Sequence, residues 1–199
     1  MDIETLKASL APLEGWCDPE KAFDLANAVI SEDALTVVEI GVFGGKSMMA
    51  IAMALTEKGS GTVFGIDPWE KIPCLDDETE TNKDWWASVD LENIYNKAQS
   101  ALSRYAFRAK LIRKTSVQAF KFWGNLPIDI LHIDGNHAVW SSCTDVVLWL
   151  PLVRPGGLVF LDDYDWKSLQ PATTLLERKC TLLRTADHAQ THYAVYRKN

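Results

Sequence analysis

Short apolar runs alternate with amphipathic segments along most of this chain. Runs rich in Val, Ile and Leu are typical of strands that are buried on both faces of a sheet. The predicted strands are 35–40, 62–66, 110–113, 128–133 and 158–161. The predicted helices between and around them are 18–30, 46–55, 91–105, 116–123, 138–150 and 172–179. Asp18 and Pro19 mark the start of the first helix, because aspartate is a good N-cap and proline fits the first helical position.

Strands that alternate with helices predict right-handed crossovers and therefore a doubly wound, mostly parallel sheet. Two further strands, 180–184 and 192–196, are separated only by a short polar loop, which favours an antiparallel hairpin. We therefore expect a single Rossmann-like α/β domain over residues 1–199, with an antiparallel hairpin at the C-terminal edge of its sheet. Residues 68–90 lack either pattern and are predicted to form an irregular insertion.

The composition is that of a globular domain, with 47% apolar and 24% charged residues in a chain of 199. No apolar run approaches the roughly 20 residues that span a bilayer, so no membrane partner is expected. The N-terminus lacks the basic start and apolar stretch of a signal peptide. The four cysteines form no C-x-x-C pair, which argues against a disulfide framework or a zinc site and favours the reducing cytoplasm. Whether the chain forms a homo-oligomer stays open.

The net charge of −7 comes from one segment of the chain. Residues 67–92 contain nine acidic and two basic side chains, whereas the acids and bases of the remaining residues balance. A protein that binds nucleic acid needs a basic stripe to neutralise phosphates, and this sequence has none. Nucleic acid is therefore not expected as a partner.

In a doubly wound sheet, ligands bind beyond the carboxyl ends of the strands. The first predicted strand contains Glu39 and leads into a glycine turn, Gly41 to Gly45, which Ser47 follows at the start of a helix. Glycines let the backbone approach a ligand closely, and the helix N-terminus offers free N–H groups. The turn is one residue too short for a P-loop and lacks two glycines of the dinucleotide fingerprint. A tight turn without a ligand is the alternative interpretation.

Polar residues also follow the second and third predicted strands. Asp67 ends the second strand, where a carboxylate can accept hydrogen bonds from the ribose hydroxyls of an adenosyl group. An ordinary loop aspartate is the alternative, but the glycine turn about 25 residues earlier makes the cofactor interpretation more specific. Thr115 and Ser116 follow the third strand, where they could face an adenine ring or cap the next helix.

Three carboxylates follow the fourth and fifth predicted strands. Asp134 comes after the fourth strand, and Asp162 and Asp163 come after the fifth. The two strands should be neighbours, so these carboxylates would converge and repel one another unless a cation joined them. Oxygen ligands suit Mg²⁺, Mn²⁺ or Ca²⁺ better than zinc. The alternative is that some of these aspartates cap the next helix while the others face solvent.

Two histidines lie close to this cluster in the sequence. His137 comes three residues after Asp134, and an imidazole there is suited to accept a proton from a hydroxyl group. A turn or capping residue is an equally open interpretation of His137. His132 lies inside the fourth strand and is expected to be a packed structural histidine.

Together these residues resemble class I S-adenosylmethionine (SAM)-dependent methyltransferases over roughly residues 15–199. More narrowly, the chain is similar to the metal-dependent O-methyltransferases of the macrocin O-methyltransferase type, which act on sugars of natural products. The residues expected to bind SAM are Glu39, Gly41, Gly45, Ser47, Asp67, Ser116 and Asp134. The residues expected to bind the divalent metal, most simply Mg²⁺, are Asp134, Asp162 and Asp163. Some macrocin-type relatives carry a second acid where this chain has Asn136, so the expected general base is His137.

The resemblance implies a metal-assisted enzyme that methylates a hydroxyl group of a small molecule, such as a sugar or another natural product. The insertion at 68–90 is expected to form a lid over the cofactor, with Trp69, Trp85 and Trp86 as flat surfaces for stacking; a packed surface loop is the alternative. A nicotinamide-dependent oxidoreductase is the second candidate, disfavoured by Phe43 and Lys46 in the turn. The third candidate is a non-catalytic SAM-binding protein, which would not need the carboxylate cluster.

Overall fold

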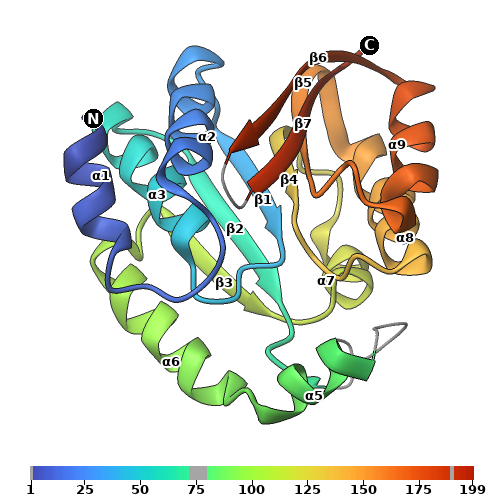
Figure 1. Ribbon diagram of the computed structural model, residues 1–199. Coiled ribbons are helices and arrows are strands. Elements are labelled where there is room, and N and C mark those ends of the chain that lie inside the picture. Colours follow the sequence, from blue (N-terminus) through green and yellow to red (C-terminus); the bar gives the residue numbers. More distant parts are fainter. Residues whose placement is uncertain (1, 72–79, 189–190) are drawn as a thin grey trace.

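A seven-stranded sheet forms the centre of the computed structural model, which describes residues 2–71, 80–188 and 191–199 (Figure 1). The strand order is β3-β2-β1-β4-β5-β7-β6. The strands β1 to β5 pair in parallel, and β7 pairs antiparallel with both β5 and β6. The strand bounds are β1 Thr36–Ile40, β2 Thr62–Asp67, β3 Ala109–Arg113, β4 Ile128–Ile133, β5 Val153–Asp162, β6 Cys180–His188 and β7 Thr191–Lys198.

Helices cover both faces of this sheet (Figure 1). One face carries α1 Ile3–Leu10, α2 Pro19–Ser31, α3 Lys46–Lys58 and α6 Leu91–Leu102. The other carries α7 Ser116–Trp123, α8 Val139–Trp149 and α9 Gln170–Glu177. The short helix α5, Glu80–Ser88, lies near the end of the sheet at which β1, β2 and β4 finish (Figure 1). This arrangement confirms the predicted doubly wound α/β fold and its antiparallel C-terminal edge.

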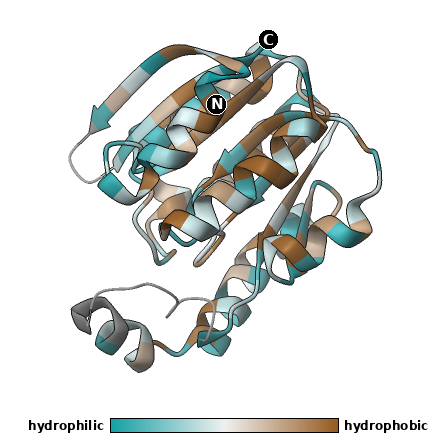
Figure 2. Cartoon of the chain, turned by 90° about the vertical axis from the view of Figure 1, so that its right-hand side faces the viewer, coloured by the Kyte–Doolittle hydropathy of each residue, from teal (hydrophilic) through white to brown (hydrophobic). Residues whose placement is uncertain are grey.

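The apolar core consists of two layers, one on each face of the sheet. Figure 2 shows the most hydrophobic residues along the central strands and on the helix segments next to them. All five residues of β1 are buried, as the continuous apolar run predicted. Within the described part of the chain, no helix combines the length and the apolar character needed to cross a bilayer.

Several elements differ from the sequence prediction, among them β6, which extends to His188 where the prediction ended at 184. Helix α1 was not expected; Asp2 caps it by accepting a hydrogen bond from the backbone N–H of Thr5, and Leu6 and Leu10 anchor it in the core. Helix α5 lies inside the segment predicted to be irregular, of which residues 72–79 are outside the described residues. Strand β5 begins at Val153, five residues before the predicted position 158; Val153 pairs with Ile128 of β4, and the Arg154 guanidinium pairs with Asp129 of the same strand.

Candidate functional site

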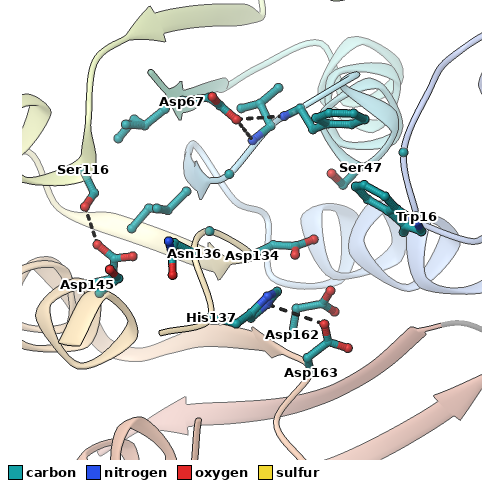
Figure 3. A pocket seen from close by; sticks show the side chains of 18 of the residues that line it. Trp16, Ser47, Asp67, Ser116, Asp134, Asn136, His137, Asp145, Asp162 and Asp163 are labelled. Atoms are coloured by element: carbon teal, nitrogen blue, oxygen red, sulfur yellow. Dashed lines mark hydrogen bonds and ion pairs between the residues drawn. The ribbon is translucent and has the colours of Figure 1, made fainter. Parts of the chain in front are cut away.

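The strand ends surround a pocket of about 860 Å³ (Figure 3). A volume of this size lies within the range of small-molecule and cofactor sites, roughly 300–1,000 Å³. The wall is built from the turn after β1, the ends of β2, β4 and β5, the first residues of α7, one side of α8, and aromatic residues before α2 and in α5. The site predicted at the carboxyl edge of the sheet therefore coincides with a cavity.

The glycine turn is shaped by its close approach to the segment that follows β4. Gly41 adopts φ +86°, and a Cβ atom at this position would lie 1.9 Å from the carbonyl oxygen of Asp134. Gly45 also has a positive φ, +85°, and forms the N-cap of α3. Gly41 lines the pocket, whereas Gly45 packs near Ala98 and Leu102 behind it. The direct cofactor contact expected of Gly45 is therefore not supported by its position.

Asp67 holds the glycine turn against the end of β2. Its Oδ2 accepts hydrogen bonds from the backbone N–H groups of Val42 and Phe43, both at 3.0 Å, and its Oδ1 accepts one from Trp69 at 2.7 Å. Burial raises the pKa of Asp67, and the three N–H donors oppose that shift. Asp67 also lines the pocket, so one carboxylate both fixes the turn and faces the space expected for the cofactor.

Glu39 differs from its predicted role. Its side chain is fully buried and lies behind the pocket wall, where it accepts a hydrogen bond from the Ser47 hydroxyl. The same oxygen lies 3.2 Å from Nδ1 of His132, which is buried in β4 as expected. Glu39 therefore connects Ser47 and His132 inside the protein, and Ser47, not Glu39, lines the pocket.

Ser116 and Asp145 form a polar pair in the wall where α7 and α8 meet (Figure 3). The Ser116 hydroxyl donates to Asp145, while Thr115 takes the N-cap position through a capping box with Gln118. Capping therefore falls to Thr115, while Ser116 lines the pocket, and the expected contact with an adenine ring stays a prediction. Burial raises the pKa of Asp145 to about 7, against the opposing hydrogen bond from Ser116.

Asp134 and Asp162 meet beside a lysine, as the close-up in Figure 3 shows for the two carboxylates. The Lys21 Nζ lies 2.8 Å from Oδ2 of Asp134 and 2.6 Å from Oδ1 of Asp162, and the lysine side chain is 0% exposed. Burial would lower the pKa of Lys21, but the two carboxylates outweigh it and raise that pKa well above its ordinary value. Burial likewise opposes ionisation of Asp134, yet the Lys21 ammonium lowers the pKa of that carboxyl to about 2. Burial and the charge of Asp134 raise the pKa of Asp162.

The third predicted metal ligand, Asp163, has a different partner. Its Oδ2 lies 3.6 Å from Nε2 of His137 (Figure 3). The His137 ring also packs on Trp166, with 5.1 Å between the ring centroids. Asp163 adopts φ +46°, and its backbone N–H donates to the carbonyl of His192 at 2.6 Å. The strand-end aspartates are thus divided between Lys21 and His137.

Aromatic rings form another part of the wall. Trp16 packs against Phe43 and Trp85, with centroid distances of 5.1 and 5.2 Å, and Trp86 meets Phe43 edge-on. All four rings line the pocket, which agrees with the stacking surfaces expected of Trp85 and Trp86. Trp69 does not contribute as expected: it is buried, and its Nε1–H donates to the carbonyl of Phe43.

Sequence reasoning missed Lys21, Asp145 and Trp16. Lys21 is four residues before Leu25 and seven before Ala28, so helical spacing places it on the buried face of α2. Asp145 is three residues after Ser142 and four before Trp149, on the buried face of α8. A charged residue on an apolar helical face was therefore the available signal for both. No comparable periodicity singles out Trp16.

The fold and the site together define a Rossmann-like methyltransferase of class I. The sheet has an antiparallel β7 between β5 and β6, and the glycine turn and Asp67 line the pocket. A family model described as a methyltransferase domain matches residues 38–164, and the chain belongs to this family.

Curated relatives are similar over parts of their length. An uncharacterized protein of Acanthamoeba polyphaga mimivirus is 31% identical over 143 residues, which are 71% of this chain and 56% of that protein. An uncharacterized protein of Sinorhizobium fredii is 26% identical over 128 residues, 64% of this chain and 13% of the relative. The matches therefore span little more than half, or much less, of these relatives.

Solved structures share the fold at low sequence identity. The O-methyltransferase TomG from Streptomyces achromogenes, involved in tomaymycin synthesis and solved with SAM, gives a TM-score of 0.67 at 17% identity; the match covers 99% of this chain and 89% of TomG. An O-methyltransferase from Bacillus cereus, solved with S-adenosylhomocysteine, gives 0.64 at 16% identity, with coverage of 98% and 90%.

Replacing Gly41 by alanine should destabilise the protein through the close contact with Asp134. Gly59 is a matched control, because it has a similar φ of +80° but open space around its Cβ position. Gly59→Ala should lower the free energy of unfolding by about 1–2 kcal/mol, the cost of the left-handed conformation. Gly41→Ala should cost clearly more, measured by urea unfolding. Equal losses would show that the contact with Asp134 relaxes freely.

Asp145→Asn should change how stability depends on pH. An unfolded aspartate releases its proton near pH 4, whereas Asp145 keeps its proton until about pH 7. Between these values the folded state binds more protons, so wild-type stability should fall relative to the variant by about 1.4 kcal/mol for each pH unit. Urea unfolding from pH 4 to 8 measures this difference, with Asp33→Asn as the exposed control. Parallel curves for wild type and Asp145→Asn would contradict the assignment.

Proposed function

We propose that this protein transfers a methyl group from SAM to a hydroxyl group of a small molecule. The observation that carries this proposal is one pocket that has the Asp67-braced glycine turn on one wall and the His137–Asp163 pair on another. Membership of the methyltransferase family supports the reaction class. The fold neighbours solved with SAM or S-adenosylhomocysteine are O-methyltransferases, which supports both the cofactor and oxygen as the acceptor atom.

The residues of the wall divide the pocket into parts with different chemistry. Asp67 offers carboxylate oxygens to the ribose of SAM, and Ser116 with Asp145 offers polar atoms where the adenine is expected. The first turn of α3, with Ser47, offers hydrogen-bond donors at a helix N-terminus, which favours an anionic group such as a carboxylate. Holding the sulfonium methyl in line with the acceptor oxygen removes much of the entropic barrier.

His137 is the group in position to accept the proton of the acceptor. As the hydroxyl oxygen bonds to the methyl carbon, the carbon–sulfur bond breaks, S-adenosylhomocysteine leaves, and the hydroxyl proton moves to the imidazole. The Asp163 carboxylate lies 3.6 Å from Nε2 of His137, which is too far for a hydrogen bond, but its negative charge would stabilise the imidazolium that forms. The Trp166 ring restricts His137 from another side. In other active sites too, an imidazole acts as the base while a neighbouring carboxylate orients it.

The acceptor class follows from the rings in the pocket. Trp16, Phe43, Trp85 and Trp86 offer flat apolar surfaces, which stack on sugar faces or aromatic rings. Acidic side chains stand at the strand ends, so a neutral acceptor fits this wall better than an anionic one. A sugar or a phenol of a natural product satisfies both conditions.

The expected divalent metal fits the donor atoms but not the charges. His132, Asp134 and Asp162 bring candidate ligand atoms within 4.8 Å of one another. However, the Lys21 ammonium already lies between two of these carboxylates, and a second cation there would be repelled. The residues therefore do not fit a divalent ion in this arrangement, and the proposed reaction contains no step that depends on one.

The cofactor assignment predicts that the protein binds SAM and S-adenosylhomocysteine in calorimetry. Asp67→Asn should weaken SAM binding by about 10-fold or more, because hydrogen bonds to a charged group contribute roughly 1.5–3 kcal/mol. Asp33→Asn, the same change at an exposed site, should have no effect. Tight binding of NADH in place of SAM would instead support the oxidoreductase alternative.

The base assignment predicts that His137→Ala lowers kcat by about 10²–10⁴ while the SAM dissociation constant changes little. Acceptors are first found by screening monosaccharides and phenols for release of S-adenosylhomocysteine. Asp163→Asn should give a smaller loss, because it removes the orienting carboxylate but leaves the imidazole. Near-normal kcat in His137→Ala would exclude the base role, and SAM binding with no turnover on any acceptor would favour the non-catalytic alternative.

A further inference from the structure

We propose that Lys21 is a built-in cation that takes the place of a divalent metal between Asp134 and Asp162. The consequence of this inference for catalysis rests on the proposed O-methyl transfer, whereas the inference about the cation itself does not. Its basis is geometric: one ammonium group contacts both carboxylates at 2.8 and 2.6 Å, and the whole lysine side chain is shielded from solvent. Lysine is almost never fully buried unless it is paired, so the two carboxylates are what allow Lys21 to be buried here.

The start of α2 directs the lysine side chain inward. Asp18 caps the helix and accepts the backbone N–H of Lys21 at 2.8 Å, while a hydroxyl from β7, that of Thr191, donates to the other oxygen of Asp18. The cap therefore ties the first turn of α2 to the strand beside β5. Lys21 is the third residue of the helix, where the backbone dipole disfavours a cation. The negative charges of Asp134 and Asp162 offset this unfavourable interaction of the lysine with the helix dipole.

A divalent ion cannot share this place with the ammonium. Its oxygen ligands would come from the same two carboxylates that Lys21 contacts, at the 2.0–2.6 Å typical of Mg²⁺ and Ca²⁺. Two cations that share these carboxylates would lie within a few ångström of each other inside the protein, where charges are poorly screened. Lys21 would have to leave, but its side chain has no exposed surface through which to reach solvent.

The effect on the site is a separation of roles among the aspartates. Lys21 holds the ends of β4 and β5 together through Asp134 and Asp162, the work that a bridging metal would do. Asp163 is left to pair with His137. Lys21 does not reach the pocket surface, so it is a positioning residue and does not touch the acceptor.

The test measures manganese binding directly, without a methyl acceptor. Wild type, Lys21→Met and Lys58→Met are stripped with a chelator, desalted and titrated with Mn²⁺, and the electron paramagnetic resonance signal of free Mn²⁺ is recorded. Lys58 pairs with Asp33 outside the pocket and controls for the loss of one positive charge. Lys21→Met should bind one Mn²⁺ on the order of tenfold or more tightly than wild type. Lys21→Arg should keep the weak binding of wild type, because it keeps the charge.

The gained manganese site should disappear in Lys21→Met/Asp162→Asn. Wild-type protein that binds one equivalent of Mn²⁺ tightly and loses it in Asp162→Asn would overturn the proposal, and this comparison stands even where Lys21→Met does not fold. A folded Lys21→Met that binds Mn²⁺ no better than wild type would also overturn it. Calorimetry with SAM on the same samples separates the two hypotheses, because absent SAM binding counts against the proposed function and leaves the manganese comparison unchanged.

Discussion

The buried contact of Lys21 with Asp134 and Asp162 is the interaction on which the arrangement of the site depends. It joins three elements that are far apart in the sequence, the first turn of α2 and the ends of β4 and β5. Removing one partner of a buried ion pair leaves an uncompensated charge, which typically costs about 3–5 kcal/mol. The contact therefore couples the packing of α2 to the pocket wall beside β4 and β5.

This contact continues into a chain of polar groups beneath the pocket. Asp134 lies 3.7 Å from Nε2 of His132, whose other ring nitrogen lies near Glu39, which in turn accepts from Ser47. The chain connects the start of α3, the middle of β1 and the end of β4. The 3.7 Å separation is too long for a hydrogen bond, and among the described residues Nε2 of His132 and Oε2 of Glu39 are buried without a hydrogen-bond partner. Unpaired polar atoms in a low-dielectric interior are costly, so this part of the site is not fully satisfied by the protein itself.

The sequence was sufficient for the fold and for one side of the site. The strands follow from continuous apolar runs, which are a local pattern of the sequence. The glycine turn and Asp67 also follow from local pattern, and both lie at the carboxyl edge of the sheet, as predicted. The electrostatic partners could not be derived in this way. Asp134, Asp162 and Asp163 look equivalent along the chain, but which side chain each one meets depends on how α2 packs and on the φ of +46° at Asp163. Glu39 was misplaced for a related reason, since a strand residue next to a ligand loop can point to either face.

Replacing a metal by an internal lysine has a consequence for the chemistry of the site. A bound divalent ion could polarise the acceptor hydroxyl directly, as metal ions do in other active sites. Lys21 cannot do so, because its ammonium is enclosed behind the carboxylates and does not reach the pocket surface. In the proposed reaction, the acceptor therefore loses its proton to a group that lines the pocket. We propose His137 for this role, because it lines the pocket beside Asp163 and lies three residues after Asp134, which pairs with Lys21. In this proposal, Asp134 and Asp162 share Lys21, and Asp163 is left to face His137.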